Sequence, residues 1–168
     1  MGQPDIMIRQ VTADDVEVLS LLIRKGFEDV AAKFGLNAEN CPKHPSNYTM
    51  DWVLTDLERG VLYFIEEDDG EPVGCVGLED AGEGIFYLER IAVLPEYRGR
   101  GLGRALLNHA VSQARKLGCR RVEIGIISDD VSLMEWYSRA GFEVTGRKRF
   151  EHLPFEVTFM ARDIHQDS

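Results

Sequence analysis

The sequence predicts an α/β protein in which helices cover the faces of one mixed sheet. Three observations lead to this class. Four segments repeat apolar residues at helical spacing, and seven short apolar runs bounded by turn residues are typical of strands. One strand–helix–strand succession in the second half also requires parallel pairing with a right-handed crossover. The chain of 168 residues, 44% of them hydrophobic, has the length of a single domain with its own core.

The expected strands are short and are separated by turns. Asp68-Asp69-Gly70-Glu71 lies between two of them and predicts an antiparallel hairpin, and residues 81–84 form the next turn. The strands are expected at residues 6–11, 61–66, 72–78, 85–93, 121–127, 142–148 and 154–161.

The helices have recognisable start and stop signals. Thr12, with Asp15 three residues later, predicts a capping box, and Gly35 ends the first helix. Either Ser46 or Thr49 caps the second helix. The four helices are expected at residues 12–34, 50–59, 101–117 and 128–140.

The composition argues against several classes of protein. No apolar run approaches the roughly 20 residues that span a bilayer, and the N-terminus lacks the pattern of a signal peptide, so we expect a cytoplasmic protein without membrane contact. The three cysteines are odd in number and far apart, which argues against a disulfide framework. Cys41 and His44 would supply only half of a metal site, so no metal is expected.

Charge is distributed unevenly along the chain. The net charge of −10 argues against non-specific binding of nucleic acid. Residues 1–97 carry 20 acidic and 7 basic side chains, whereas residues 98–168 carry 9 acidic and 12 basic ones. Seven basic residues and no acidic one lie between Arg98 and Arg121. This basic segment predicts a site for a polyanion, and the acidic remainder is compatible with a cationic second ligand.

The segment Arg98-Gly99-Arg100-Gly101-Leu102-Gly103-Arg104 joins an expected strand to an expected helix. Three glycines at alternate positions remove side chains, so backbone N–H groups can converge on a ligand. The helix start adds unpaired N–H groups and the positive end of its dipole, which suits a phosphate or pyrophosphate. The segment lacks the Gly-Lys-Ser/Thr ending of a Walker A loop, and its third glycine comes too early for a dinucleotide fingerprint. The alternative is a structural turn with incidental arginines.

Two motifs resemble the GNAT N-acetyltransferase superfamily. Its Arg/Gln-x-x-Gly-x-Gly/Ala hallmark is matched by Arg98, Gly101 and Gly103, and its Tyr-x-x-x-Gly-Phe signature is matched by residues 137–142. The resemblance is specific over residues 60–145, and the order of elements extends it to about residues 5–162. It implies one acetyltransferase domain with a central, mostly antiparallel mixed sheet of six to seven strands. In this family a bulge splays the sheet in the middle, and about four helices flank it.

The resemblance implies transfer of an acetyl group from acetyl-CoA to an amine by direct attack in a ternary complex. Backbone amides around residues 100–104 would hold the CoA pyrophosphate, and the end of the 85–93 strand would pair with the pantetheine arm. The implied cofactor contacts are Ile91, Ala92, Val93, Arg98, Gly99, Arg100, Gly101, Leu102, Gly103, Arg104 and Asp130. Asp130 stands where the family often has Asn, and the other interpretation of this residue is a helix cap. Family members often dimerise, although no interface is recognisable in the sequence.

The implied reaction needs a base and an acid. A lysine-like amine has a pKa near 10.4 and is protonated at pH 7, so a carboxylate that accepts its proton is useful. Glu89 is the candidate for this base or for an acceptor anchor; the alternative is an ion pair with Arg90 or Arg121. Tyr137 has the place of the family's general acid for the departing CoA thiolate; the alternative is a core tyrosine beside Trp136.

The acceptor side carries no recognisable motif. Residues 35–47 form a long loop rich in Asn and Pro, and a loop of this length is either mobile or functional. Tyr48 and Trp52 are candidates for the acceptor pocket or for the core. His152 is a candidate proton shuttle or a solvent-facing loop residue.

Three functions are therefore compatible with the sequence. The first is an N-acetyltransferase for a small amine, with a cationic acceptor favoured by the acidic N-terminal half. The second is transfer to a protein N-terminus or lysine, which needs an open groove. The third is a sensor that binds acetyl-CoA without transfer. The presence of both Glu89 and Tyr137 favours an enzyme, and the long loop favours a small acceptor.

Overall fold

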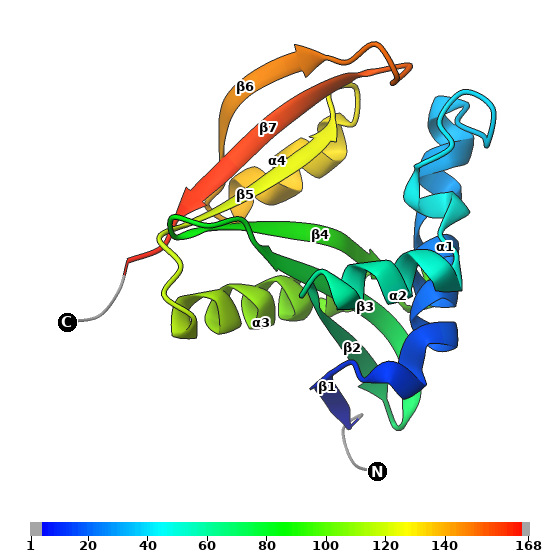
Figure 1. Ribbon diagram of the computed structural model, residues 1–168, viewed down its shortest axis with the longest axis vertical. Coiled ribbons are helices and arrows are strands. Elements are labelled where there is room, and N and C mark those ends of the chain that lie inside the picture. Colours follow the sequence, from blue (N-terminus) through cyan, green and yellow to red (C-terminus); the bar gives the residue numbers. More distant parts are fainter. Residues whose placement is uncertain (1–4, 166–168) are drawn as a thin grey trace.

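The computed structural model describes residues 5–165 and shows one seven-stranded sheet in the order β1-β2-β3-β4-β5-β7-β6 (Figure 1). Four α-helices within these residues cover the sheet, which confirms the expected α/β class. The strands are β1 Ile6–Gln10, β2 Leu62–Asp68, β3 Glu71–Asp80, β4 Ile85–Val93, β5 Arg121–Ile127, β6 Glu143–Arg149 and β7 Glu156–Asp163. The helices are α1 Val16–Phe34, α2 Met50–Glu58, α3 Leu102–Lys116 and α4 Val131–Arg139.

The sheet opens between its two central strands. All neighbouring strands pair antiparallel except β4 and β5, which are parallel and pair only through residues 85–87 and 121–123. Beyond that point the two strands separate, as Figure 1 shows. The remainder of β4 therefore has a free backbone edge toward β5, which is the splay that the resemblance implies.

A bulge in β4 accompanies this opening. On β3, Cys75 pairs with Ala92 and Gly77 pairs with Glu89, so the register shifts by one residue between them. Arg90 lies at the shift and has a φ of 51°, a left-handed conformation that is uncommon for a residue other than glycine. Bulges of this kind bend a strand and redirect side chains.

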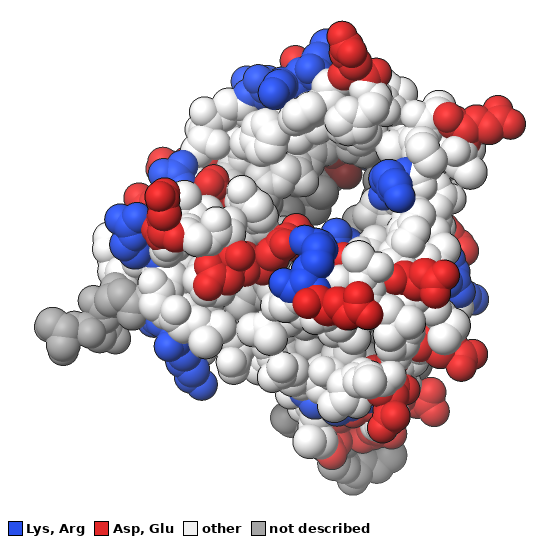
Figure 2. Space-filling model, viewed as in Figure 1, with Lys and Arg blue, Asp and Glu red and all other residues white. Residues whose placement is uncertain are grey.

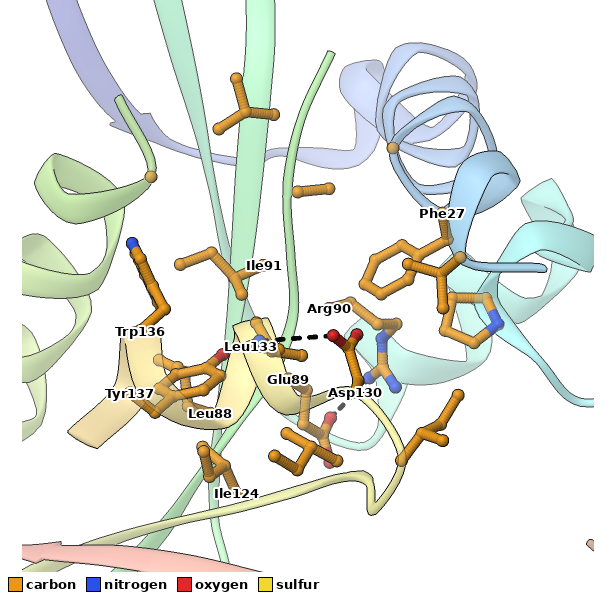
Figure 3. A pocket seen from close by; sticks show the side chains of 18 of the residues that line it. Phe27, Leu88, Glu89, Arg90, Ile91, Ile124, Asp130, Leu133, Trp136 and Tyr137 are labelled. Atoms are coloured by element: carbon orange, nitrogen blue, oxygen red, sulfur yellow. Dashed lines mark hydrogen bonds and ion pairs between the residues drawn. The ribbon is translucent and has the colours of Figure 1, made fainter. Parts of the chain in front are cut away.

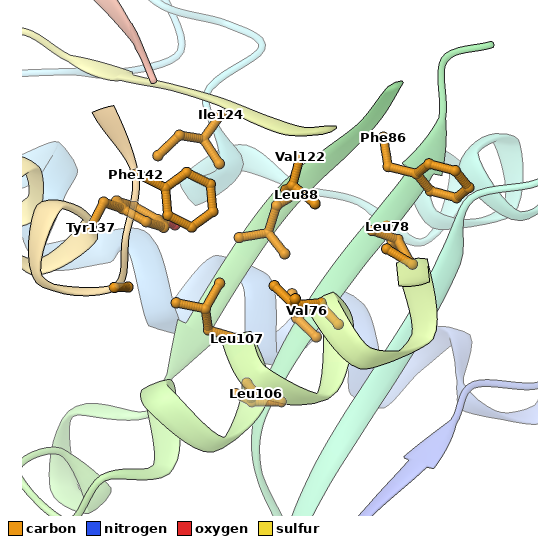
Figure 4. Close-up of a cluster of buried hydrophobic side chains, with 14 of the residues drawn as sticks. Val76, Leu78, Phe86, Leu88, Leu106, Leu107, Val122, Ile124, Tyr137 and Phe142 are labelled. Atoms are coloured by element: carbon orange, nitrogen blue, oxygen red, sulfur yellow. The ribbon is translucent and has the colours of Figure 1, made fainter. Parts of the chain in front are cut away.

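The helices divide between the two faces of the sheet. Helices α1 and α2 pack on one face in a core that includes Leu19, Ile23, Val53 and Tyr63. Helices α3 and α4 pack on the other face, in the larger core that Figure 4 shows around Leu106, where the side chains of both helices meet those of β3, β4 and β5.

Local sequence signals account for most element boundaries. Asp15 and Thr12 form the expected capping box, and Arg9 bonds the Asp15 carboxylate at 2.9 Å. Thr49 caps α2 by accepting a hydrogen bond from the Trp52 N–H at 3.1 Å, which settles the choice between Ser46 and Thr49. The hairpin turn is shorter than expected. Strand β2 continues to Asp68, and the turn is Asp69-Gly70 with φ angles of 50° and 85°, the geometry that Asp-Gly favours in two-residue hairpins.

Candidate active site

A cavity of about 1020 Å³ occupies the opening between β4 and β5. Its walls come from both strands, from α1, from α4 and from the glycine-rich turn before α3. This volume is at the upper end for small-molecule sites and is large enough for two ligands that meet in the middle. Figure 2 shows an opening in the molecular surface at this level, with acidic and basic side chains gathered beside it.

The glycine-rich turn forms one wall of the cavity. Gly99 and Gly101 both have a φ of 79°, and Gly101 is the residue at which α3 begins. The turn therefore presents backbone N–H groups and the positive end of the α3 dipole, as a phosphate group requires. Together with the free edge of β4, these features fit a CoA pyrophosphate followed by an extended pantetheine arm.

The arginines of this turn have different surroundings. Arg98 donates hydrogen bonds to the carbonyl oxygens of Val93 at 3.0 Å and Gly26 at 2.9 Å, and it forms an ion pair with Asp29 at 2.5 Å. It therefore ties α1 to the turn, and its guanidinium is engaged with protein groups. The Arg100 guanidinium lies 5.4 Å from the centre of the Tyr97 ring. Arg100 and Arg104 are exposed and lie outside the cavity lining, where they can supply positive charge at its mouth.

The other predicted cofactor contacts lie along the same wall. Ile91, Ala92 and Val93 follow the bulge of β4 and line the cavity together with Leu102 and Gly103. Gly103 faces Trp136, whose ring would be 3.5 Å from an added Cβ. A side chain larger than hydrogen would therefore narrow the cavity at this position.

Glu89 lies on the floor of the cavity beside the bulge. It forms the ion pair with Arg90 that the sequence left open as an alternative, at 2.5 Å, and it also lines the cavity (Figure 3). Burial raises its pKa to about 7, against the opposing effect of the Arg90 charge and with a further upward contribution from Glu79. A carboxyl group that titrates near neutral pH is well suited to accept a proton at that pH.

Arg90 is held by a buried polar network beneath the cavity. Its Nε donates to the Tyr63 hydroxyl at 2.5 Å, and its guanidinium lies 3.4 Å from Asp56. The Tyr48 and Tyr63 hydroxyls both donate to the same oxygen of Asp56. These partners hold the Arg90 guanidinium in place. Because Arg90 also pairs with Glu89, they hold the Glu89 carboxyl group in place as well.

Tyr137 is a core residue that also lines the cavity. Its ring packs edge-on against Trp136 and Phe142, with centroids at 5.0 and 5.3 Å, and only 4% of the residue is exposed. It nevertheless lines the cavity from α4, opposite Leu88 and Ile91 (Figure 3). Burial raises the pKa of its hydroxyl, so the group stays protonated and can donate.

Asp130 is a helix cap and a cavity residue at once. Its carboxylate accepts a hydrogen bond from the Leu133 N–H at 3.3 Å, which confirms its capping role (Figure 3). It also lines the cavity at the start of α4.

The predicted acceptor residues lie elsewhere. Tyr48 is buried in the α1–α2 core, and Trp52 packs edge-on against it with centroids at 5.2 Å. Neither lines the cavity, so of the two interpretations that the sequence left open, their surroundings are those of the core, and Tyr48 also belongs to the network around Arg90. His152 is exposed and also lies outside the lining of the cavity. The centre of its ring is 5.7 Å from that of Phe150, and the two rings are tilted against each other.

The residues that do line the acceptor side were missed by sequence reasoning. They come from α1, the loop that follows it, β5, the β6–β7 connection and β7, and they share no motif. They are Phe27, Val30, His44, Pro45, Glu123, Phe155, Val157 and Phe159. Phe27 had a signal as part of the apolar stripe of the first helix, and His44 and Pro45 lie in the long loop that the sequence marks as mobile or functional, but neither signal indicates a pocket specifically.

The sequence profile of the acetyltransferase (GNAT) family matches residues 28–142. The chain belongs to this family. The matched range includes the glycine-rich turn, the bulged strand and Tyr137, so the family's sequence signature covers the cavity described above. The resemblance to the GNAT family that the two sequence motifs carry is thereby confirmed. Within the described residues, no helix is long and apolar enough to cross a membrane.

Individual relatives agree with the family. The chain is 32% identical over 146 residues to an uncharacterised N-acetyltransferase of Methanocaldococcus jannaschii, in a match that covers 81% of this chain and 60% of that protein. The chain thus spans about 60% of the length of this curated relative.

Solved GNAT structures share the fold. The PaiA N-acetyltransferase of Thermoplasma acidophilum, in complex with coenzyme A, superimposes with a TM-score of 0.77 at 20% identity, covering 95% of this chain and 99% of that one. The ribosomal-protein-S18-alanine N-acetyltransferase of Escherichia coli gives a TM-score of 0.76 at 17% identity, covering 98% and 97%.

Proposed function

We propose that this chain transfers the acetyl group of acetyl-CoA to a primary amine of a small-molecule acceptor. Both substrates would be bound together, and the amine would attack the thioester directly. Acetyl-CoA supplies the activated acetyl group, and the chain supplies the cradle, the base and the acid. The proposal assigns the glycine-rich turn and the β4 edge to the cofactor and the far end of the cavity to the acceptor.

The observation that carries the choice of a small acceptor is the closure of that far end. The end of α1 and the following loop meet the end of β5 and the β6–β7 connection in one apolar cluster. Its members are Ala31, Leu36, Cys41 and Ile127, with Val30, Phe34, Leu153 and Phe155 packed against them. A peptide would need an open groove across this region, whereas a small amine needs only a pocket.

The walls of this pocket suit a partly apolar amine. Phe27, Phe155 and Phe159 provide apolar surface, while Glu89 and Glu123 provide negative charge. Arg90 also lines the cavity, but its guanidinium is engaged with protein carboxyl and hydroxyl groups. The charge left for an acceptor is therefore negative, which favours an ammonium group.

The proposed proton transfers use Glu89 and Tyr137. Glu89 takes the proton of the acceptor ammonium, and because its pKa is about 7 it does so at neutral pH. Tyr137 donates its proton to the leaving sulfur, for which a protonated phenol with a raised pKa is suited. Both side chains line the cavity, Tyr137 from α4 and Glu89 from β4 (Figure 3), and the proposal assigns the reacting centre to the space that they share.

Thiol release in the presence of amines tests this function. Acetyl-CoA binding is measured first by isothermal titration, and thiol release is then followed with a panel of polyamines, lysine-like amines and arylalkylamines. A set of peptides with free N-termini or lysines forms the second arm. We expect release with a small amine and a kcat/KM that rises through about pH 7 as Glu89 loses its proton.

Two variants make the test specific. Glu89→Gln should lower kcat by about 10²–10⁴ and remove the acidic limb of the profile while acetyl-CoA still binds. If thiol is released with peptides alone, the acceptor is a protein and not a small molecule. Acetylation of a protein is also the activity that the name of the similar Escherichia coli enzyme states. Binding without release in either arm would indicate a sensor and would overturn the proposal.

A further inference from the structure

The proposed base, Glu89, is one member of a closed ring of charged side chains. Arg59 pairs with Glu79 at 2.5 Å and with Asp56 at 3.0 Å. Asp56 pairs with Arg90 at 3.4 Å, and Arg90 pairs with Glu89 at 2.5 Å. Glu79 and Glu89 are diagonal neighbours on the paired strands β3 and β4, and the interaction of their carboxyl groups closes the ring. Four of the five contacts therefore join opposite charges, and one joins two carboxyl groups.

The β-sheet register brings these two carboxyl groups together. On β3, Gly77 lies opposite Glu89 and Glu79 lies opposite Tyr87, so Glu79 is the diagonal neighbour of Glu89 on the face covered by α2. Gly77 leaves room between them because it has no side chain; a Cβ there would approach the Tyr63 ring to 2.9 Å. The contact between the two glutamates is thus a consequence of the strand pairing.

The charges of the ring do not balance when all its members are ionised. Three carboxylates face two guanidinium groups, which leaves one excess negative charge in a largely buried site. One proton held between two carboxyl groups removes both the excess charge and the repulsion. The charged and titratable groups that face this pair are Tyr48, Asp56, Arg59, Tyr63, Arg90 and, across the cavity, Glu123.

Asp56 is not the carboxyl group that takes this proton. Burial by itself would raise its pKa, but hydrogen bonds from Tyr48 and Tyr63 and the charges of the two arginines lower it. Its oxygens thus have donors already. Glu79 and Glu89, by contrast, have only one guanidinium partner each among the ion pairs of the described residues.

Glu79 lies on the side of Glu89 that points away from the cavity. Glu89 lines the cavity, whereas Glu79 does not. The partner of Glu79, Arg59, is at the protein surface with 48% of its side chain exposed. A proton that reaches Glu89 from the cavity can therefore leave toward Glu79 and the solvent beside Arg59 without crossing the bound substrates.

We propose that Glu79 shares the proton that Glu89 takes from the acceptor amine and passes it to solvent. This inference rests on the proposed function. In the transfer, the N–H bond of the ammonium breaks, its electron pair stays on nitrogen, and an O–H bond forms on Glu89. That O–H donates to Glu79, and the proton then moves to Glu79 and to water. Glu79 acts through Glu89 and is a positioning residue that never touches the substrate.

Two variants of the ring have opposite expected effects. Glu79→Gln removes the repulsion on Glu89, so we expect the acidic limb of kcat/KM to move down by about one pH unit, with kcat at neutral pH lowered about tenfold. Arg59→Gln leaves Glu79 without its positive partner, so the same limb should move up. Glu79→Asp keeps a carboxyl group at this position, so its acidic limb of kcat/KM should lie close to that of the unmodified chain. Glu71→Gln, at an exposed position of the same strand, is the matched control.

The pH profiles of these variants distinguish a proton-sharing role of Glu79 from a purely structural one. Loss of packing would lower kcat in both ring variants without moving their pH limbs in opposite directions. An unshifted limb in Glu79→Gln, with kcat unchanged, would overturn the proposal. Carboxyl ¹³C NMR titration of the substrate-free protein provides the second readout, since Glu79→Gln should lower the Glu89 midpoint. Should the unmodified chain release no thiol with any amine, the proposed function fails, and the titration still decides whether the two carboxyl groups share a proton.

Discussion

Glu66 provides a test of how burial affects the stability of this fold. It lies on β2, between Ile8 of β1 and Gly74 of β3, on the face that α3 covers. It is fully buried, and neither carboxyl oxygen has a hydrogen-bond partner among the described residues. Desolvation raises its pKa from 4.5 to about 7. The protein therefore folds most favourably with this group protonated.

The magnitude follows from that shift. Each pKa unit corresponds to about 1.4 kcal/mol, so the rise from 4.5 to about 7 means that ionisation of Glu66 costs about 3.5 kcal/mol of folding free energy. As pH rises from about 4.5 to 7, the unfolded chain loses this proton while the folded chain retains it, so stability falls over this window. The loss is complete above pH 7. Glu66→Gln keeps the shape of the side chain and cannot ionise, so it should remove this loss.

Urea unfolding at pH 5 and pH 8 measures the effect. We expect the stability of Glu66→Gln relative to the unmodified chain to rise by about 2.5 kcal/mol between these pH values, because part of the loss has already occurred at pH 5. Glu58→Gln, at an exposed position on α2, should show no comparable pH dependence. If the difference between Glu66→Gln and the unmodified chain is the same at both pH values, Glu66 is solvated or paired in solution, and the reasoning from burial is refuted.

Three further substitutions test the site and the core. Tyr137→Phe should lower kcat by about 10²–10³ while the Kd of acetyl-CoA, measured by titration, stays unchanged; equal kcat would remove the acid role. Gly26→Ala places a Cβ 2.4 Å from the Ala92 Cβ and should destabilise the fold by about 1–3 kcal/mol in urea. Adding Ala92→Gly should restore part of that loss, and an additive double variant would contradict the contact. Leu106→Ala empties a fully buried position under β3 and should cost about 2–5 kcal/mol; a loss below 1 kcal/mol would mean that the core collapses around it.

The elements of the fold could be predicted because their signals are local. Helix caps such as Thr49, apolar periodicity and the glycine-rich turn act over a few residues, and all of them survive in the structure. The expected hairpin turn is longer than the observed one because β2 continues through acidic residues that show no apolar pattern. Glu67 and Asp68 belong to β2 although neither side chain is apolar, and their place depends on pairing with β1 on one side and β3 on the other.

The glycine-rich wall of the cavity is encoded in one stretch of chain, so its place in the fold could be predicted from the sequence. The turn of residues 98–104 and the strand before it carry their own geometry in their glycines and strand pattern. The position of Tyr137 on the cavity wall could also be predicted, because its motif stands at the end of a single helix. In each case the chemistry depends on neighbours within a few positions, which a sequence displays directly.

The part of the cavity around Glu89, to which we assign the acceptor, depends on contacts between distant segments, and only the folded chain reveals it. The ring around Glu89 takes Asp56 and Arg59 from α2, Glu79 from β3 and Arg90 from the bulge in β4. Whether these side chains meet is decided by the strand register and by the docking of α2, neither of which leaves a local pattern. The pairing and packing of the whole sheet thus set the proton affinity of Glu89, while its position in the chain reveals only that a carboxyl group is present.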